Sequence, residues 1–171
     1  MAKAAGARKA AAAPPADETA LGLGGLMRWG ALAALGVAGM GVAAYLTYAH
    51  YADEVVACGG LGRCETVQQS EYSTIAGVPV ALLGGLAAAA LLAIALGRLG
   101  GLPLAVEWAS MATLGLTTAS VAFAAYLTYI ELFVLDAICL YCLALASIFT
   151  ASWLISLSDS FLTRGISPEP G

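Results

Sequence analysis

Charged side chains are scarce in this chain of 171 residues. Lysine, arginine, aspartate and glutamate make up 11% of the sequence, and hydrophobic residues make up 61%. Because soluble domains carry roughly 25% charged residues, this composition excludes an ordinary soluble domain and indicates a membrane protein. The net charge is -4, so no basic surface is available for nucleic acid. The single histidine, His50, disfavours a soluble hydrolase that depends on a histidine base.

Long gaps between the charged residues predict four transmembrane helices. The uncharged runs cover about residues 29–49, 78–97, 108–130 and 137–157. Each run holds about 20 residues, which as a helix cover the ~30 Å of a bilayer core at ~1.5 Å per residue. No run alternates with the period of two that a transmembrane strand requires. We therefore expect an all-α polytopic membrane protein, in which a four-helix bundle is covered by an outer-face loop acting as a lid.

The rest of the chain divides around this bundle. We expect a disordered cytoplasmic tail over residues 1–25, a membrane domain over 26–157 with an outer loop at 50–77, and a second cytoplasmic tail over 158–171. Small residues in the first two runs should let helices pack closely in the lipid. The glycines concerned are Gly36, Gly39, Gly41, Gly84 and Gly85.

Positive charges predict the orientation of the bundle. They precede the first run, occupy the second connection and follow the last run, whereas the first and third connections are mainly acidic. By the positive-inside rule, both termini are cytoplasmic in a multi-pass protein of the cell (inner) membrane. The loop 50–77 and the turn 131–136 then lie on the outer face, together with all four cysteines. The positive residues in these three places are Lys3, Arg8, Lys9, Arg28, Arg98 and Arg164, and the seventh, Arg63, lies in the first connection.

One pair of cysteines opens the fourth apolar run as a C-x-x-C motif, Cys139 and Cys142. Residues three apart share one face of a helix, at roughly the spacing that a disulfide needs. With Asp136 as the N-cap, Cys139 would lie in the first helical turn, where the positive end of the helix favours a thiolate. Cys142 would lie one turn deeper.

The second pair, Cys58 and Cys64, brackets three glycines in the outer loop. This composition suits a mobile disulfide, and a loop of about 28 residues is long enough to be a lid or shuttle. Two dithiols on one face suit electron relay by thiol–disulfide exchange. Two other interpretations stay open: a non-catalytic membrane protein whose loop disulfide is structural, and a Cys₄ metal-binding membrane protein.

Three segments together resemble bacterial members of the vitamin K epoxide reductase family. They are CETVQQSEY at 64–72, GVPVALLG at 77–84, and CLYC at 139–142. In the DsbB family, the other four-span thiol:quinone enzymes, the C-x-x-C motif lies in the first outer loop instead. The resemblance covers about residues 26–157.

The resemblance implies a thiol:quinone oxidoreductase that supports disulfide formation. A reduced thioredoxin-like (DsbA-type) protein would pass electrons to Cys58, Cys64 would attack Cys139, and the freed Cys142 would face a membrane quinone, either ubiquinone or menaquinone. Ser70 matches a serine beside the quinone site of the family. About 14 residues follow the fourth run, so the thioredoxin-like partner is expected to be a separate protein. No metal is implied.

Two positions differ from the animal enzymes of the family. Those enzymes hold their naphthoquinone with an asparagine and with a tyrosine four residues after C-x-x-C. This chain has no asparagine, and the second position is Ala146. We therefore do not expect it to reduce vitamin K epoxide.

Overall fold

The computed structural model describes residues 22–52, 54–56, 58 and 62–165, and for 104–107 and 159–165 it describes only the backbone. Four long helices dominate: α1 (Leu23–Tyr51), α3 (Val80–Leu99), α4 (Pro103–Phe133) and α5 (Leu140–Gly165). Each contains a stretch long and apolar enough to cross a membrane. The predicted all-α, four-span architecture is confirmed. Of the tails expected at 1–25 and 158–171, residues 1–21 and 166–171 lie outside the described residues, whereas 23–25 belong to α1 and 158–165 belong to α5.

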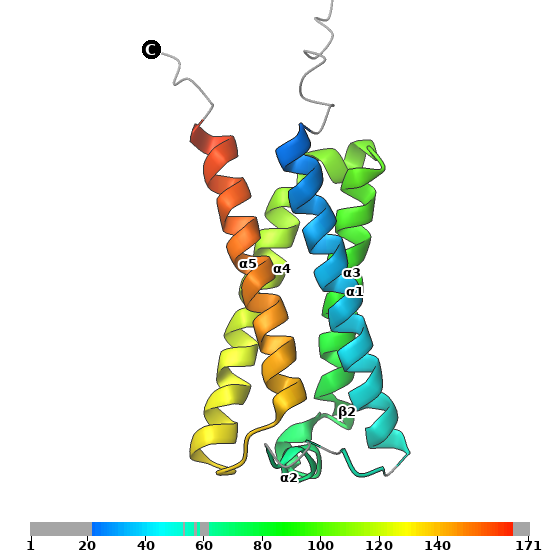
Figure 1. The fold of residues 1–171 in the computed structure, drawn as a ribbon, viewed down its shortest axis with the longest axis vertical. Coiled ribbons are helices and arrows are strands. Elements are labelled where there is room, and N and C mark those ends of the chain that lie inside the picture. The colour runs from blue at the N-terminus through cyan, green and yellow to red at the C-terminus, as the bar shows by residue number, and fades with distance from the viewer. Residues whose placement is uncertain (1–21, 53, 57, 59–61, 166–171) are drawn as a thin grey trace, which may run out of the picture.

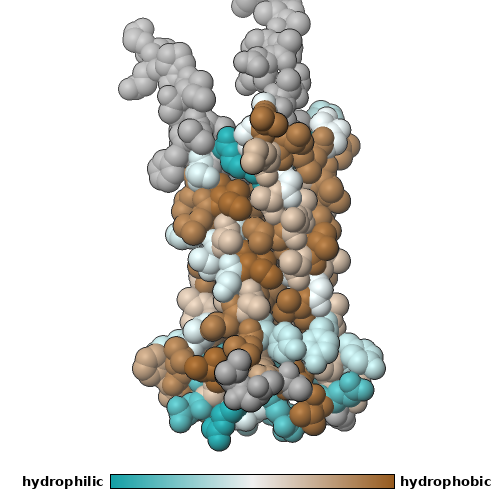
Figure 2. Space-filling model, in the orientation of Figure 1, coloured by the Kyte–Doolittle hydropathy of each residue, from teal (hydrophilic) through white to brown (hydrophobic). Residues whose placement is uncertain are grey.

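The helices form two adjacent pairs, α1 beside α3 and α4 beside α5, as Figure 1 shows. The start of α1 and the end of α5 lie at the same end of the bundle (Figure 1). At the opposite end, the first connection folds into α2 (Cys64–Gln68), the 3₁₀ helix η1 (Glu71–Ser73) and a hairpin of β1 (Thr74–Ile75) with β2 (Val78–Pro79). Polar surface collects at this end, and the shaft of the bundle is largely hydrophobic (Figure 2).

Glycines allow α1 and α3 to pack at short range. A Cβ atom added to Gly36 would lie 3.0 Å from the Cβ of Leu92, and one added to Gly39 would lie 3.1 Å from the Cβ of Ala88. Gly85 approaches α1 in the same way, 3.3 Å from Ala43. Gly41 does not share this role, because a Cβ there would meet nothing within 4 Å.

The long helices extend beyond the predicted spans at some ends and stop short at others. α1 begins six residues before the predicted span, at Leu23. α4 continues past Ile130 to Phe133, so Glu131 belongs to a helix and not to a turn. α5 begins at Leu140, three residues later than predicted. The extension of α4 brings Glu131 of the third connection into contact with the start of α5.

Candidate functional site

The loop cysteines form a disulfide that lies against the C-x-x-C segment. Cys58 and Cys64 are bonded, with their Cα atoms 5.8 Å apart, and only 1% of Cys64 is exposed. The Arg63 amide donates a hydrogen bond to the Ile138 carbonyl oxygen over 2.9 Å. Cys64 and Cys139 belong to one buried cluster, so the two cysteine pairs share the same part of the molecule.

Gly62 makes this close approach possible. A Cβ atom at position 62 would lie 2.6 Å from the Ile138 carbonyl oxygen, much closer than such atoms normally come. The Arg63 guanidinium adds a weaker contact, 3.4 Å from the Asp136 carbonyl oxygen. The loop glycine therefore provides close contact at position 62, in addition to any flexibility it confers.

Cys139, and not Asp136, caps α5. Asp136 lies four residues before the helix in the left-handed region, with φ of 46°. Cys139 immediately precedes Leu140, and its sulfur accepts a hydrogen bond from the Cys142 amide at 3.3 Å. This is the geometry of an N-cap side chain that binds the third amide of its helix. The prediction of Asp136 as the cap was wrong, because the chain needs three further residues to turn back toward the bundle.

The two cysteines of the C-x-x-C motif are free thiols in contact. The Cys142 thiol donates a hydrogen bond to the Cys139 sulfur, with the sulfur atoms 2.6 Å apart. This hydrogen bond lowers the pKa of the Cys139 thiol, although burial acts in the opposite direction. Since a thiolate is the form that takes part in exchange, Cys139 is prepared to attack a neighbouring disulfide.

A buried carboxyl group stands beside this pair. Glu131, in the last turn of α4, exposes only 4% of its surface. One of its oxygens accepts a hydrogen bond from the Cys139 amide at 3.0 Å. The sequence predicted Glu131 in the outer-face turn 131–136. The apolar residues 132–135 that follow it are the signal that could have indicated a longer helix.

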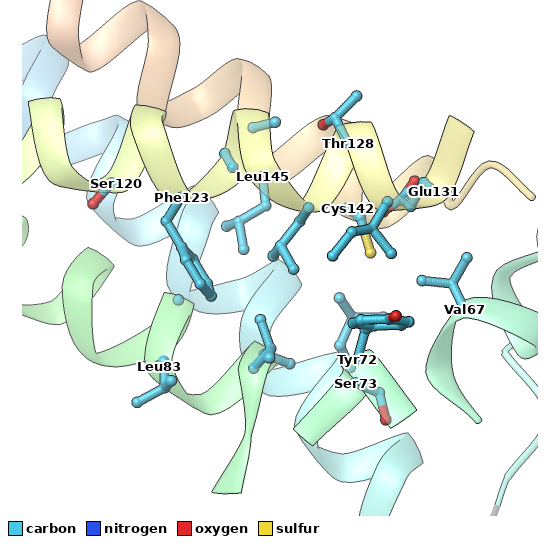
Figure 3. Close-up of a pocket in the computed structure, with 18 of the residues that line it drawn as sticks. Val67, Tyr72, Ser73, Leu83, Ser120, Phe123, Thr128, Glu131, Cys142 and Leu145 are labelled. Carbon is cyan, nitrogen blue, oxygen red and sulfur yellow. The ribbon is translucent and has the colours of Figure 1, made fainter. Parts of the chain in front are cut away.

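An apolar cavity of about 390 Å³ lies between the two helix pairs. Cys142 lines it, and its sulfur points inward, with Tyr72 on the opposite side (Figure 3). Phe123 and Glu131 of α4 line the same space. The remaining walls include Leu83, Gly84, Leu116, Leu127, Leu145, Ala146 and Phe149.

Two polar side chains of the lid segment before η1 line the cavity, and Tyr72 and Ser73 of η1 line it as well. Ser70, the predicted quinone contact, is one of them, and its hydroxyl donates a 2.7 Å hydrogen bond to the Val67 carbonyl oxygen. Ser70 precedes η1 but makes no side-chain cap to it. Gln68 is the other, and its buried Nε2 has no hydrogen-bond partner among the described residues. Gln68 was not predicted from the sequence, since nothing in the sequence distinguishes it from its neighbour Gln69.

Two aromatic residues of α5 lie elsewhere. Tyr141 packs against Tyr45, with ring centroids 5.1 Å apart. Trp153 donates a hydrogen bond to the Thr118 hydroxyl on α4. Neither is among the residues that line the cavity.

A disulfide, a dithiol and an apolar cavity at one end of four membrane-spanning helices define a membrane thiol–disulfide oxidoreductase. Residues 30–157 match the Vitamin K epoxide reductase family, and the chain belongs to that family. Members of this family couple thiol–disulfide chemistry to a quinone, typically with a thioredoxin-like partner. The resemblance noted in the sequence is thereby confirmed.

A Cys₄ metal site does not agree with this arrangement. Two of the four sulfurs that it would need are joined in the Cys58–Cys64 disulfide, whereas metal ligation requires thiolates. Within the described part of the chain, no three metal-ligating side chains of any type gather at one point.

Proposed function

We propose that the protein oxidises a separate thioredoxin-like (DsbA-type) protein and passes the electrons through Cys58/Cys64 and Cys139/Cys142 to a membrane quinone. The observation that supports this most directly is the chain of contacts from the loop disulfide through Cys139 to Cys142 at the cavity. The product is a disulfide in the partner, which then oxidises exported proteins. A DsbA-type partner has a potential of about -120 mV, so only a more oxidising acceptor such as a quinone keeps it oxidised.

Each exchange step breaks one disulfide bond and forms another. With C-x-x-C oxidised, a partner thiolate attacks Cys58 and breaks its bond to Cys64. Cys64 then attacks Cys139, and Cys142 leaves as a thiolate. The second partner thiol releases Cys58 as the partner disulfide forms, and Cys58 then attacks Cys64, which frees Cys139. The result is a loop disulfide and a C-x-x-C dithiol, the same pairing that the structure contains.

The cavity suits a quinone ring. Its volume of about 390 Å³ lies within the range of small-molecule sites, and its lining is mainly apolar, so burial would supply most of the binding energy. Cys142 would lie against the ring, which accepts two electrons and two protons. The Gln68 amide has no other partner among the described residues and can donate to a ring carbonyl oxygen. The Ser70 hydroxyl could also donate, after it turns away from the Val67 carbonyl oxygen. Either ubiquinone or menaquinone satisfies these contacts.

Vitamin K epoxide is not the proposed substrate. The position that carries tyrosine in the animal enzymes is Ala146, which lines the cavity without a hydrogen-bond donor. The asparagine of those enzymes has no counterpart in this chain. Epoxide reduction by the purified protein would contradict this part of the proposal.

We also propose that the cysteine end of the bundle faces outward and that both termini are cytoplasmic. The basis is the distribution of positive charges: Arg28 lies near the start of α1 and Arg98 in the last turn of α3, and these helix ends are opposite the end that carries α2 and β2 (Figure 1). A membrane-impermeant maleimide applied to intact cells after reduction should label Cys58 and Cys64. Labelling that requires exposure of the cytoplasmic side would reverse the orientation.

Trapping the intermediate tests the relay. In Cys142→Ser, the Cys139 thiolate can attack Cys64 of the loop disulfide and displace Cys58 as a thiolate. No thiol remains at position 142 to resolve the new bond, so the bond between Cys64 and Cys139 should accumulate without any added reductant. Non-reducing peptide mapping detects it, and Cys139→Ser is the matched control that cannot form it. If Cys64 were found joined only to Cys58, the loop disulfide would be structural and the relay would be wrong.

A further inference from the structure

Glu131 is an ionisable residue inside a membrane-spanning helix. It lies on α4 within the Trp108–Phe133 segment and is almost completely buried. Burial of a carboxyl group in an apolar environment is costly, so such residues are rare within the bilayer and usually mark a functional path. The exchange steps described above give Glu131 no role.

The contacts of Glu131 all point toward the reacting thiols. The Cys139 amide donates to it over 3.0 Å, and its carboxyl group is within hydrogen-bonding reach of the Cys142 thiol. No lysine, arginine or histidine among the described residues neutralises it. It also lines the cavity beside Cys142 (Figure 3). The carboxyl group therefore bridges the thiol pair and the space proposed for the quinone.

We propose that Glu131 is a catalytic residue that takes the proton of Cys142 and delivers it to the quinone. This inference rests on the proposed function, because it assigns a proton path to the same reaction. A carboxylate in hydrogen-bonding reach of a reacting group is well placed as a general base and then as a general acid.

The proposed step balances in atoms and charge. Cys142 gives its proton to the Glu131 carboxylate, and its sulfur becomes the nucleophile that gives two electrons to the quinone ring. Cys139 loses its proton to water at the outer face, and the bond between Cys139 and Cys142 closes. One quinone oxygen receives the proton held by Glu131, and the other receives a proton from water. The products are a C-x-x-C disulfide, a quinol and a regenerated carboxylate.

Two variants separate this role from a structural one. Glu131→Gln keeps an oxygen that can accept the hydrogen bond from the Cys139 amide, but it cannot carry the proton. Glu71→Gln makes the same chemical change at an exposed position of η1 and is the matched control. Both variants keep the four cysteines.

Single-turnover kinetics provide the first test. Protein with a reduced C-x-x-C pair is mixed anaerobically with ubiquinone, and quinol formation is followed by absorbance. We expect Glu131→Gln to slow this step by about a hundredfold or more, the usual range for loss of a general acid–base group. Reduction of the loop disulfide by a thioredoxin-like protein should stay within threefold of the parent rate. Equal rates of quinol formation in the parent protein and Glu131→Gln would overturn the proposal.

Infrared difference spectra provide a second test without quinone. When iodoacetamide alkylates Cys142 in the reduced parent protein, iodide leaves, the displaced thiol proton should move to Glu131, and a carboxylic-acid C=O band should appear. The band should be missing in Glu131→Gln and present in Glu71→Gln. A band that persists in Glu131→Gln, or that never appears in the parent protein, would refute the assignment. If the parent protein makes no quinol at all, the proposed function fails, whereas these spectra still decide whether Glu131 accepts the thiol proton.

Discussion

Replacement of Gly62 by alanine should slow electron transfer between the two cysteine pairs. The added Cβ would lie 2.6 Å from the Ile138 carbonyl oxygen, and carbon–oxygen contacts normally begin near ~3.3 Å. The loop must then withdraw by roughly 0.7 Å, which would stretch the 2.9 Å Arg63–Ile138 hydrogen bond beyond its useful range. Loss of this bond costs about 0.5–1.5 kcal/mol. Since about 1.4 kcal/mol corresponds to a factor of ten, we expect the equilibrium constant for docking of the loop on Ile138, and with it the rate of exchange, to fall roughly two- to twelvefold.

The assay measures how fast Cys64 reaches Cys139. In a Cys142→Ser background, the Cys139 thiolate displaces Cys58 from Cys64, and the Cys64–Cys139 bond is quantified on non-reducing gels at intervals after a shift from acidic to neutral pH. Reduction of the Cys58–Cys64 disulfide itself should keep its rate, because the change affects docking and not the chemistry at Cys58.

The control and the refutation come from the same experiment. Gly41→Ala adds the same methyl group to α1, where nothing lies within 4 Å, and the rate should not change. An unchanged rate for Gly62→Ala as well would show that exchange does not require the observed docking of the loop on Ile138.

Three further predictions concern the relay and the cavity. Cys58→Ser should retain quinol formation with a small permeant dithiol as electron donor and lose it with a protein partner. Cys139→Ser should lose quinol formation with both donors. Equal loss with both donors for Cys58→Ser would contradict the shuttle role of Cys58. Ser70→Ala should raise the apparent KM for quinone by roughly tenfold or less, as expected for the loss of one hydrogen bond. Gln68→Leu should raise this KM by at least as much, because the Gln68 amide has no other partner among the described residues. An unchanged KM in Gln68→Leu would show that the amide does not bind the quinone. In the reduced protein the hydrogen bond from Cys142 lowers the pKa of Cys139, so its alkylation by iodoacetamide should already rise at pH values below those of an ordinary thiol; Cys142→Ala should move the profile to higher pH, and coincident profiles would refute this cause.

The number of spans and the two cysteine pairs follow from the sequence alone. A bilayer requires about 20 apolar residues per helix, so uncharged runs of that length determine a four-helix bundle without knowledge of any contact. The C-x-x-C spacing and the order of the two pairs likewise indicated the family. These features are local in the chain, and the physical constraints that reveal them are local as well.

The details of the site depend on contacts between distant segments. Asp136 is a better N-cap than cysteine by residue type, yet Cys139 holds that position because of where the turn after α4 brings the chain. Glu131 resembles the charged end of a span, but α4 extends far enough to bury it against the start of α5. Ser70 matched the family, whereas the unpartnered amide belongs to Gln68. Burial and hydrogen-bond partners are properties of packing, so only the tertiary structure decides which polar groups reach the cavity.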